Sequence, residues 1–247
     1  MTTPRPRSMP PLRVAALALL GLFAGAGSAS AQAPISPGGL AAGTPALAAV
    51  PALVGQPLSF AGTVGGTGAG SRLQVQLRAR ATTQWRTVAT VVADGDGAFQ
   101  ASWTSVVAGR FAVRAVPLGR AVAASVEAPL ATTVTVYRPA TATWYDLAGR
   151  TGTCGVHITA ATIGVAHKTL PCGSRVDVRY GDRTLSVPVI DRGPYARGVS
   201  YDLTRAAADA LGMTAAGKAQ VGVLPAGERT PSALLLAGAF GGLPAVG

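Results

Sequence analysis

The chain has 247 residues, which suits one large domain or two small ones, and glycine (32) and proline (18) together make up a fifth of it. Because 49% of the residues are hydrophobic, the chain can bury a core, and disorder of the whole chain is excluded. The formal net charge is +11, yet arginine and lysine form no dense run and no zinc-finger or RNA-recognition motif is present. We therefore expect no nucleic-acid partner, whereas a diffuse positive charge fits an anionic surface such as a bacterial wall.

The N-terminal segment has the three parts of a secretory signal peptide. Arg5, Arg7 and Arg13 precede the apolar stretch 14–27, and small residues with an A-x-A cleavage pattern follow in 28–33. The apolar stretch is shorter than the ~20 residues that a membrane-spanning helix needs, and no cysteine follows it that could carry a lipid. We expect residues 1–33 to be removed and the protein to be secreted or held in the wall or periplasmic space. It would then be neither a lipoprotein nor stably membrane-spanning.

Residues 34–57 are rich in proline, alanine and glycine and are predicted to form a linker. Residues 58–138 then contain short segments of alternating hydrophobicity, such as Leu73, Val75 and Leu77 with polar residues between them. Short strands at 10–15-residue spacing, separated by glycine and aspartate turns, predict a β-sandwich. The run 87–116 also resembles bacterial immunoglobulin-like modules of secreted surface proteins, and we assign this module no chemistry.

Residues 139–224 are predicted to form a compact β-barrel with one helix. Segments 175–180 and 183–190 alternate around a turn at Gly181-Asp182, which is typical of a hairpin. Thr204 can cap a helix over 205–211. Gly212 would end that helix. Beyond it, residues 225–247 are apolar but rich in glycine, proline and alanine, and we expect a flexible tail.

Four ordered blocks in this segment identify a family resemblance. They are Ala142-Thr-Trp-Tyr145, Ala166-His-Lys-Thr-Leu-Pro171, Val189-Ile-Asp-Arg-Gly-Pro194 and Tyr201-Asp-Leu-Thr204. Together they resemble the rare lipoprotein A (RlpA) family over about 85 residues. The resemblance implies an all-β protein whose second domain is a six-stranded double-psi β-barrel, a fold shared with expansins. It also implies an exported protein that acts on peptidoglycan, because some members are lytic transglycosylases that leave a 1,6-anhydro sugar end.

Such a reaction needs a positioned carboxylic acid. The glycosidic oxygen leaves only when it is protonated, and the same group can then accept the proton of the sugar's own 6-hydroxyl. By its place in the third block Asp191 is the catalytic candidate, although an aspartate at a strand end can also simply cap a turn. His167, from the second block, would supply a hydrogen bond or a positive charge near the acid, or be a structural histidine. No cofactor is implied.

The sequence departs from the family at one position. Transglycosylase members carry a glutamate eleven residues before the block histidine, where this chain has Val156, and residues 139–224 contain no glutamate. Asp202 offers a different parallel, because it follows Asp191 by eleven residues and bacterial expansins place two functional aspartates at that spacing. Expansins loosen wall polymers without detectable hydrolysis. The alternative for Asp202 is a plain turn residue ahead of the helix.

The two cysteines, Cys154 and Cys172, lie within the predicted barrel with His157 and His167 between them. This order permits a zinc site, but its spacing fits no standard finger. Export favours a disulfide, which would close a 19-residue loop and stabilise the fold by roughly 3 kcal/mol. We predict the disulfide and no metal.

Aromatic residues are the remaining candidates, because their faces can stack on sugar rings. Trp144 and Tyr145 would point to opposite faces of one strand, so only one of them can line a cleft. We expect Tyr145 and Tyr195, together with Asp202, to contact a wall polysaccharide. Three hypotheses remain: a peptidoglycan transglycosylase with weakened catalysis, a non-catalytic expansin-like binder that loosens wall glycan, and a structural or partner-binding protein.

Overall fold

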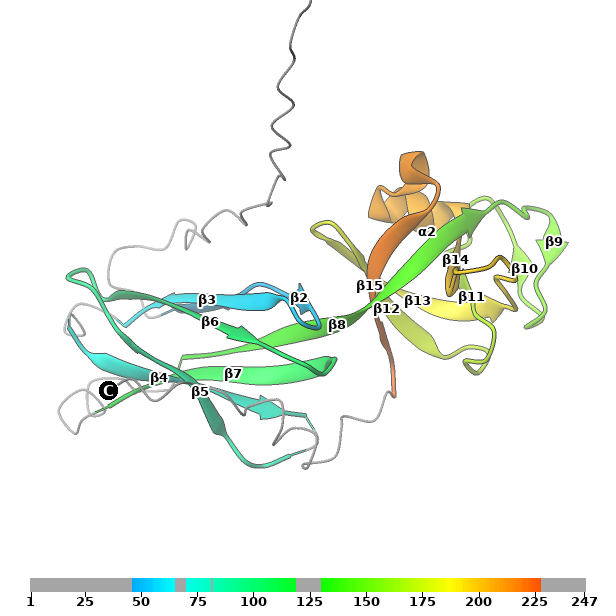
Figure 1. Cartoon of the computed structure of the whole chain (residues 1–247). Coiled ribbons are helices and arrows are strands. Elements are labelled where there is room, and N and C mark those ends of the chain that lie inside the picture. Colours follow the sequence, from blue (N-terminus) through cyan, green and yellow to red (C-terminus); the bar gives the residue numbers. More distant parts are fainter. Residues whose placement is uncertain (1–45, 65–69, 81, 119–129, 228–247) are drawn as a thin grey trace, which may run out of the picture. The chain divides into compact units, whose positions relative to one another are not determined.

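The computed structural model describes residues 46–64, 70–80, 82–118 and 130–227 (Figure 1). The predicted signal peptide and nearly all of the predicted tail lie outside the described residues. Within the described part of the chain, no helix is both long enough and apolar enough to cross a bilayer.

The first part of the described chain is a sandwich of two β-sheets. One sheet has the order β1-β3-β6, and the other contains β5, β4, β7 and the first half of β8. Alternate residues point inward, so that Leu73, Val75 and Leu77 are fully buried between the sheets, as their spacing predicts. The strands are β1 (Ala46–Ala49), β3 (Pro57–Thr63), β4 (Arg72–Ala79), β5 (Arg86–Val92), β6 (Ala98–Thr104), β7 (Gly109–Pro117) and β8 (Leu130–Tyr145).

The segment predicted to be a linker is partly strand. β1 pairs with β3, and β2 (Ala52–Leu53) pairs with β8. Ala52 is 1% exposed and belongs to the sandwich core, so this segment is held by sheet pairing and burial. Its alanine-rich composition hid these strands, because alanine and proline are depleted in strands generally.

β8 is one continuous strand that serves both sheets. It pairs with β7 through residues 130–136 and with β15 (Ala219–Pro225) through residues 138–142 (Figure 1). Pro139 lies after the last β7 partner, so its missing N–H costs no bond to that strand. The boundary that the sequence predicted between residues 138 and 139 therefore falls inside this strand.

The second part is a closed barrel of six strands with one short helix, as predicted. Its strand order is β14-β11-β13-β12-β15-β8, and pairing between β14 and β8 closes the ring. The interior is filled by small and branched side chains, with Val165, Val176, Val189 and Leu203 fully buried. The other strands are β9 (Arg150–Thr151), β10 (His157–Ile158), β11 (Val165–Ala166), β12 (Arg175–Tyr180), β13 (Arg183–Asp191) and β14 (Tyr201–Thr204).

Helix α2 (Arg205–Leu211) begins and ends where the sequence predicts. The Thr204 side chain accepts a hydrogen bond from the backbone N–H of Ala207, and Gly212 adopts a left-handed conformation with φ 73°. Ala207, Ala208 and Leu211 pack onto the barrel core. A short 3-10 helix, η1 (Thr214–Ala216), follows it.

Candidate functional site

Three adjacent strands bring the two candidate aspartates together. Ala166 of β11 is paired with Asp191 at the end of β13 on one side and with Asp202 of β14 on the other. Two strand spacings separate the Cα atoms of the aspartates by about 10 Å. The eleven-residue spacing in sequence therefore becomes a pair of carboxylates flanking one buried alanine.

Asp191 is buried, with 9% of its surface exposed, and its carboxylate is held by two backbone donors. Its Oδ1 atom accepts the N–H of Thr153 at 2.7 Å and the N–H of Arg192 at 2.8 Å. Burial alone raises the pKa of Asp191, but the hydrogen bonds from Thr153 and Arg192 and the Arg192 charge outweigh it and lower that pKa. The carboxylate is therefore ionised in the resting protein, ready to accept a proton or to stabilise positive charge.

The Thr153 donor is delivered by the turn between β9 and β10. Gly152 lies so close to the β13 backbone that a Cβ atom would stand 2.7 Å from the Ile190 carbonyl oxygen and 3.3 Å from the Asp191 Cγ atom. Only glycine allows this approach without displacing the hairpin. Val156 belongs to the same turn, and its carbonyl oxygen accepts the N–H of Gly152 at 2.8 Å.

Arg192 ties the other side of the site to the segment that follows β11. One guanidinium nitrogen donates to the carbonyl oxygens of His167 and Leu170, and the other lies 3.0 Å from the Sγ atom of Cys172. Cys172 forms a disulfide with Cys154, as predicted, with 5.6 Å between the Cα atoms. The disulfide thus links the turn that carries Thr153 to the segment that the Arg192 side chain contacts.

Asp202 has the opposite electrostatic character. It is partly buried, and its Oδ1 atom accepts a hydrogen bond of 2.6 Å from the Thr143 hydroxyl across the β14–β8 pair. Burial raises the pKa of Asp202, the Thr143 hydrogen bond opposes this, and the negative charge of Asp191 raises it further, so the net shift is upward. Two titratable groups with shifts of opposite sign in one site are the arrangement that proton-transfer chemistry uses.

His167 is not a source of positive charge. Its Nδ1 atom accepts hydrogen bonds from the backbone N–H groups of Thr169 and Leu170, and this leaves the ring proton on Nε2. Burial, and then the charges of Arg192 and Lys168, lower the pKa of His167, so the imidazole is neutral. Its contact with the candidate acid is through the backbone, where its N–H donates to the Asp191 carbonyl oxygen at 3.1 Å.

Tyr145, rather than Trp144, belongs to the site. Burial and then the charges of Asp191 and Asp202 raise the pKa of Tyr145, and its hydroxyl oxygen is buried with no hydrogen-bond partner among the described residues. Trp144 points the other way, packs against the barrel core and donates from Nε1 to the Thr214 carbonyl oxygen at 3.0 Å. Alternation along the strand predicted that only one of the two would face the site.

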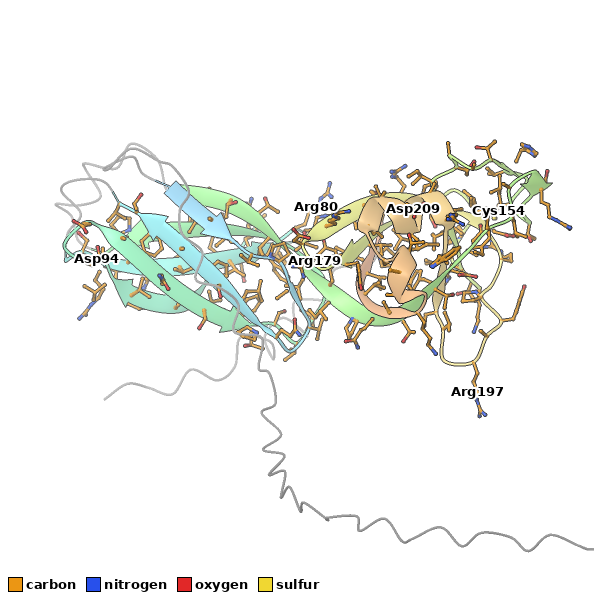
Figure 2. The ribbon with its side chains drawn as sticks, turned by 90° about the horizontal axis from the view of Figure 1, so that it is seen from above. Arg80, Asp94, Cys154, Arg179, Arg197 and Asp209 are labelled. Carbon is orange, nitrogen blue, oxygen red and sulfur yellow. A yellow bond between two sulfur atoms is a disulfide. The ribbon has the colours of Figure 1, made fainter. Side chains whose placement is uncertain are left out.

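Two further candidates stand on exposed turns. Tyr195 is 83% exposed on the loop after the cis Gly193–Pro194 peptide, four residues past the buried Asp191 at the end of β13. The same loop projects Arg197 away from the barrel, as Figure 2 shows. Val156, where the resemblance predicts a glutamate, is 37% exposed, so this side chain reaches solvent and does not lie in the core.

The cysteines are consumed by the disulfide and cannot bind zinc as thiolates. Among the residues that the structure describes, no three histidine, cysteine, aspartate or glutamate side chains gather into a group that could hold a metal ion.

Sequence reasoning missed the residues that tune the two carboxylates. Thr143 and Arg192 stand inside recognised blocks, but their partners are distant in sequence, so nothing local identified their roles. Gly152 and Thr153 lie in a segment with no recognised block, and their contacts with Asp191 exist only after the hairpin has packed against β13.

Comparison with known proteins matches residues 139–223 to a family model described as lytic transglycolase. Two relatives are named probable endolytic peptidoglycan transglycosylase RlpA. The one from Aquifex aeolicus is 40% identical over 76 residues, covering 29% of this chain and 34% of the relative. The one from Nostoc sp. is 42% identical over 77 residues, covering 30% of this chain and 20% of the relative. The chain thus spans a third or less of the length of these relatives.

Solved structures similar to this chain include the Streptomyces papain inhibitor, with 30% identity and a TM-score of 0.30 over 34% of this chain and 91% of that one. A Clavibacter michiganensis expansin variant in complex with cellohexaose has 23% identity and a TM-score of 0.33 over 37% of this chain and 51% of that one. From the family match and the two relatives, residues 139–223 are an RlpA-like double-psi β-barrel domain.

Proposed function

We propose that this chain is an exported wall protein whose barrel binds peptidoglycan glycan strands at Asp191 and Asp202 and cleaves them slowly, as a lytic transglycosylase. The observation that carries the proposal is the carboxylate pair on either side of Ala166, one with a lowered and one with a raised pKa. The family model and the names of the two relatives support the choice of peptidoglycan and of this reaction.

In the proposed reaction a proton moves to the glycosidic oxygen as the bond from C1 to that oxygen breaks. The sugar's 6-hydroxyl oxygen then bonds to C1 and releases its own proton, so no water is consumed. Asp191, held as a carboxylate, faces the developing positive charge and accepts the hydroxyl proton. The donor is Asp202, whose raised pKa lets it take up a proton more readily than an ordinary aspartate, and after the reaction Asp191 releases a proton to solvent and Asp202 takes one up.

We expect slow turnover because the family's glutamate position is Val156. A well-placed general acid or base contributes roughly 10²–10⁴-fold to rate, and here Asp191 and Asp202 would act without the additional carboxyl group that the resemblance implies at that position. The same absence favours the second candidate function, a binder that holds and loosens glycan strands without cleaving them. Under that alternative Asp191, Asp202, Tyr145 and the exposed Tyr195 contact the glycan, and no bond breaks.

Incubating the mature protein with purified sacculi separates the two. Release of 1,6-anhydro muropeptides, read by mass spectrometry and lost in Asp191→Asn, supports the transglycosylase. Co-sedimentation without products, weakened by Asp191→Asn and Asp202→Asn, supports the binder. If neither variant alters digestion or co-sedimentation, the proposed site is wrong. N-terminal sequencing of protein from the wall and medium fractions tests export, for which we expect a start at residue 32 or 34.

A further inference from the structure

The outward face of the sandwich sheet β5-β4-β7-β8 carries several arginines. Arg110 of β7 pairs with Asp177 of β12, whereas Arg72, Arg78 and Arg114 form no ion pair with an acidic side chain among the described residues. Along β4 the outward residues alternate with the buried ones and read Arg72, Gln74, Gln76 and Arg78. Arg114 of β7 stands opposite Gln76 on the same face. In the described part of the sandwich, the acidic side chains are Asp94 and Asp96, both in the turn between β5 and β6. Figure 2 shows Asp94 at one end of the sandwich and Arg80, which follows β4, at the other.

Two of these arginines are pre-ordered by an aromatic ring. The guanidinium carbon of Arg114 lies 4.2 Å from the centre of the Trp85 ring, and that of Arg78 lies 4.9 Å from it. Arg114 also donates from Nε to Gln76 Oε1 at 2.8 Å, and Gln76 is itself bonded to Gln74 and Thr87. Holding a long side chain in place before a ligand arrives reduces the entropy that binding must overcome.

The stacked guanidinium groups retain donors for a ligand. A guanidinium group has five N–H donors. Arg114 uses one of them in its hydrogen bond to Gln76, and Arg78 makes no hydrogen bond to another described side chain. Each of these two guanidinium groups can match the oxygens of a phosphate group, which accept paired hydrogen bonds from arginine. Outward positions on a strand repeat about every 6.8 Å, which suits a linear polymer with one charge per short repeat.

We propose that this arginine face (Arg72, Arg78 and Arg114 with Gln74, Gln76 and Trp85) binds a phosphate-bearing polymer of the bacterial wall. The ligand differs from that of the barrel, where two carboxylates flank the site and a polyanion would be repelled. The sandwich then anchors the protein to anionic wall polymer while the barrel contacts the glycan strand. The face goes beyond the proposed function, and its chemistry depends on neither Asp191 nor Asp202.

The test compares binding of the full mature chain to intact walls, to walls stripped of phosphate polymers by hydrofluoric acid, and to soluble poly(glycerol phosphate). We expect binding to the intact wall and to the soluble polymer. The double variant Arg78→Gln with Arg114→Gln should lose at least about tenfold in affinity for the soluble polymer. The matched control, Arg197→Gln with Lys218→Gln, removes the same charge from exposed barrel residues and should change that affinity less than about threefold.

A further variant distinguishes the paired hydrogen bonds of the guanidinium groups from their positive charge. Arg78→Lys with Arg114→Lys keeps both charges and should still lose affinity, because lysine cannot make the paired hydrogen bonds. Thermal unfolding of each variant shows whether the sandwich remains folded. Equal losses of affinity for the soluble polymer in the Gln variant and its control, or polymer removal that lowers the wall binding of wild type and of the Gln variant equally, would overturn the proposal. So would equal competition by a polyuronate or by single-stranded DNA. Asp191→Asn, assayed on stripped walls, tests the barrel site separately.

Discussion

At the scale of single residues, the site consists of two aspartates whose surroundings push their pKa values apart. Asp191 accepts backbone N–H groups from two different segments, while Asp202 has a single hydroxyl donor and lies near the Asp191 charge. Sequence spacing placed the two residues in one motif. Their opposite character arises from partners that the chain brings from elsewhere.

This difference predicts opposite effects on stability. The pKa of Asp191 is lower in the folded state than in the unfolded chain, so its carboxylate stabilises the fold above about pH 4 and that contribution is lost as the pH falls through the folded pKa. Asp191→Asn should therefore cost roughly 1.5–3 kcal/mol of unfolding free energy at pH 7, and less in acid.

Asp202 should behave in the reverse way. Its pKa is raised on folding, so its ionised form destabilises the fold at neutral pH, and the penalty disappears as the pH falls through that raised pKa. Asp202→Asn keeps an acceptor for the Thr143 hydroxyl and should stabilise the protein at pH 7 but not in acid. Urea unfolding of both variants across a pH series measures the effects. Destabilisation of the same sign by both variants at pH 7 would contradict the assignment.

Val156→Glu tests the missing carboxylate. Val156 is 37% exposed on the turn that also carries Thr153, so a glutamate there stays hydrated and we expect little loss of stability. If the position acts as the family resemblance implies, release of anhydro muropeptides should rise by up to roughly 10²–10⁴-fold. Val156→Gln, similar in shape but without the acid, is the control and should give no gain. Equal activity in the two variants would show that the carboxyl group has no role.

At the scale of elements, the β9–β10 hairpin and the segment after β11 act together on Asp191. Thr153 precedes Cys154, and the Arg192 side chain contacts Cys172, so the disulfide connects the turn of one donor to a contact of the other. Replacing both cysteines with alanine should cost about 2–5 kcal/mol of unfolding free energy. It should also raise the pKa of Asp191 as the Thr153 hydrogen bond loosens, which carbon NMR of the carboxyl group can follow. Wild type in reductant provides the matched comparison, and an unchanged titration would separate the disulfide from the site.

The junction of β14 and α2 depends on one hydroxyl. Besides capping α2, Thr204 Oγ1 lies 3.1 Å from the N–H of Gly164 and 3.3 Å from its carbonyl oxygen, and Thr204 is 2% exposed. Thr204→Ala should therefore cost more than the ~1 kcal/mol of an ordinary cap, up to about 3 kcal/mol, because a buried N–H loses its partner. Thr204→Ser retains the hydroxyl and should recover most of the loss in a thermal or urea unfolding experiment.

At the scale of the whole molecule, the chain presents two surfaces of opposite charge, the arginine face of the sandwich and the carboxylate pair of the barrel. If both surfaces bind wall components, the two binding activities should differ in their sensitivity to salt. Raising ionic strength from about 0.05 to about 0.5 M should abolish binding to soluble poly(glycerol phosphate) and leave most of the binding to stripped sacculi. Sedimentation at the two salt concentrations measures binding to each ligand. An equal loss of binding to the two ligands would contradict the assignment of one ligand to the sandwich and the other to the barrel.

Much of the fold followed from local patterns. Alternation along β4, the turn at Gly181-Asp182 between β12 and β13, and the Thr204 and Gly212 signals around α2 all appear where the sequence predicts them, because each depends on neighbours within a few residues. The four blocks likewise predicted the barrel, which the structure confirms, while the role of Asp191 stays a prediction. The continuous β8 and the strands before residue 58 could not be read locally, because their pairing partners lie far along the chain.

The character of the site depended on the tertiary structure. The sequence determined that Asp191, Asp202 and Tyr145 belong to shared motifs and that the cysteines pair. Only the packed barrel decided that Asp191 is ionised, that His167 is neutral and that Val156 faces solvent. The physical reason is that a pKa depends on burial, hydrogen bonds and charges within a few ångströms. Apart from Arg192 beside Asp191, the groups that set these pKa values come from parts of the chain that are distant in sequence, such as Thr153 for Asp191 and Thr143 for Asp202.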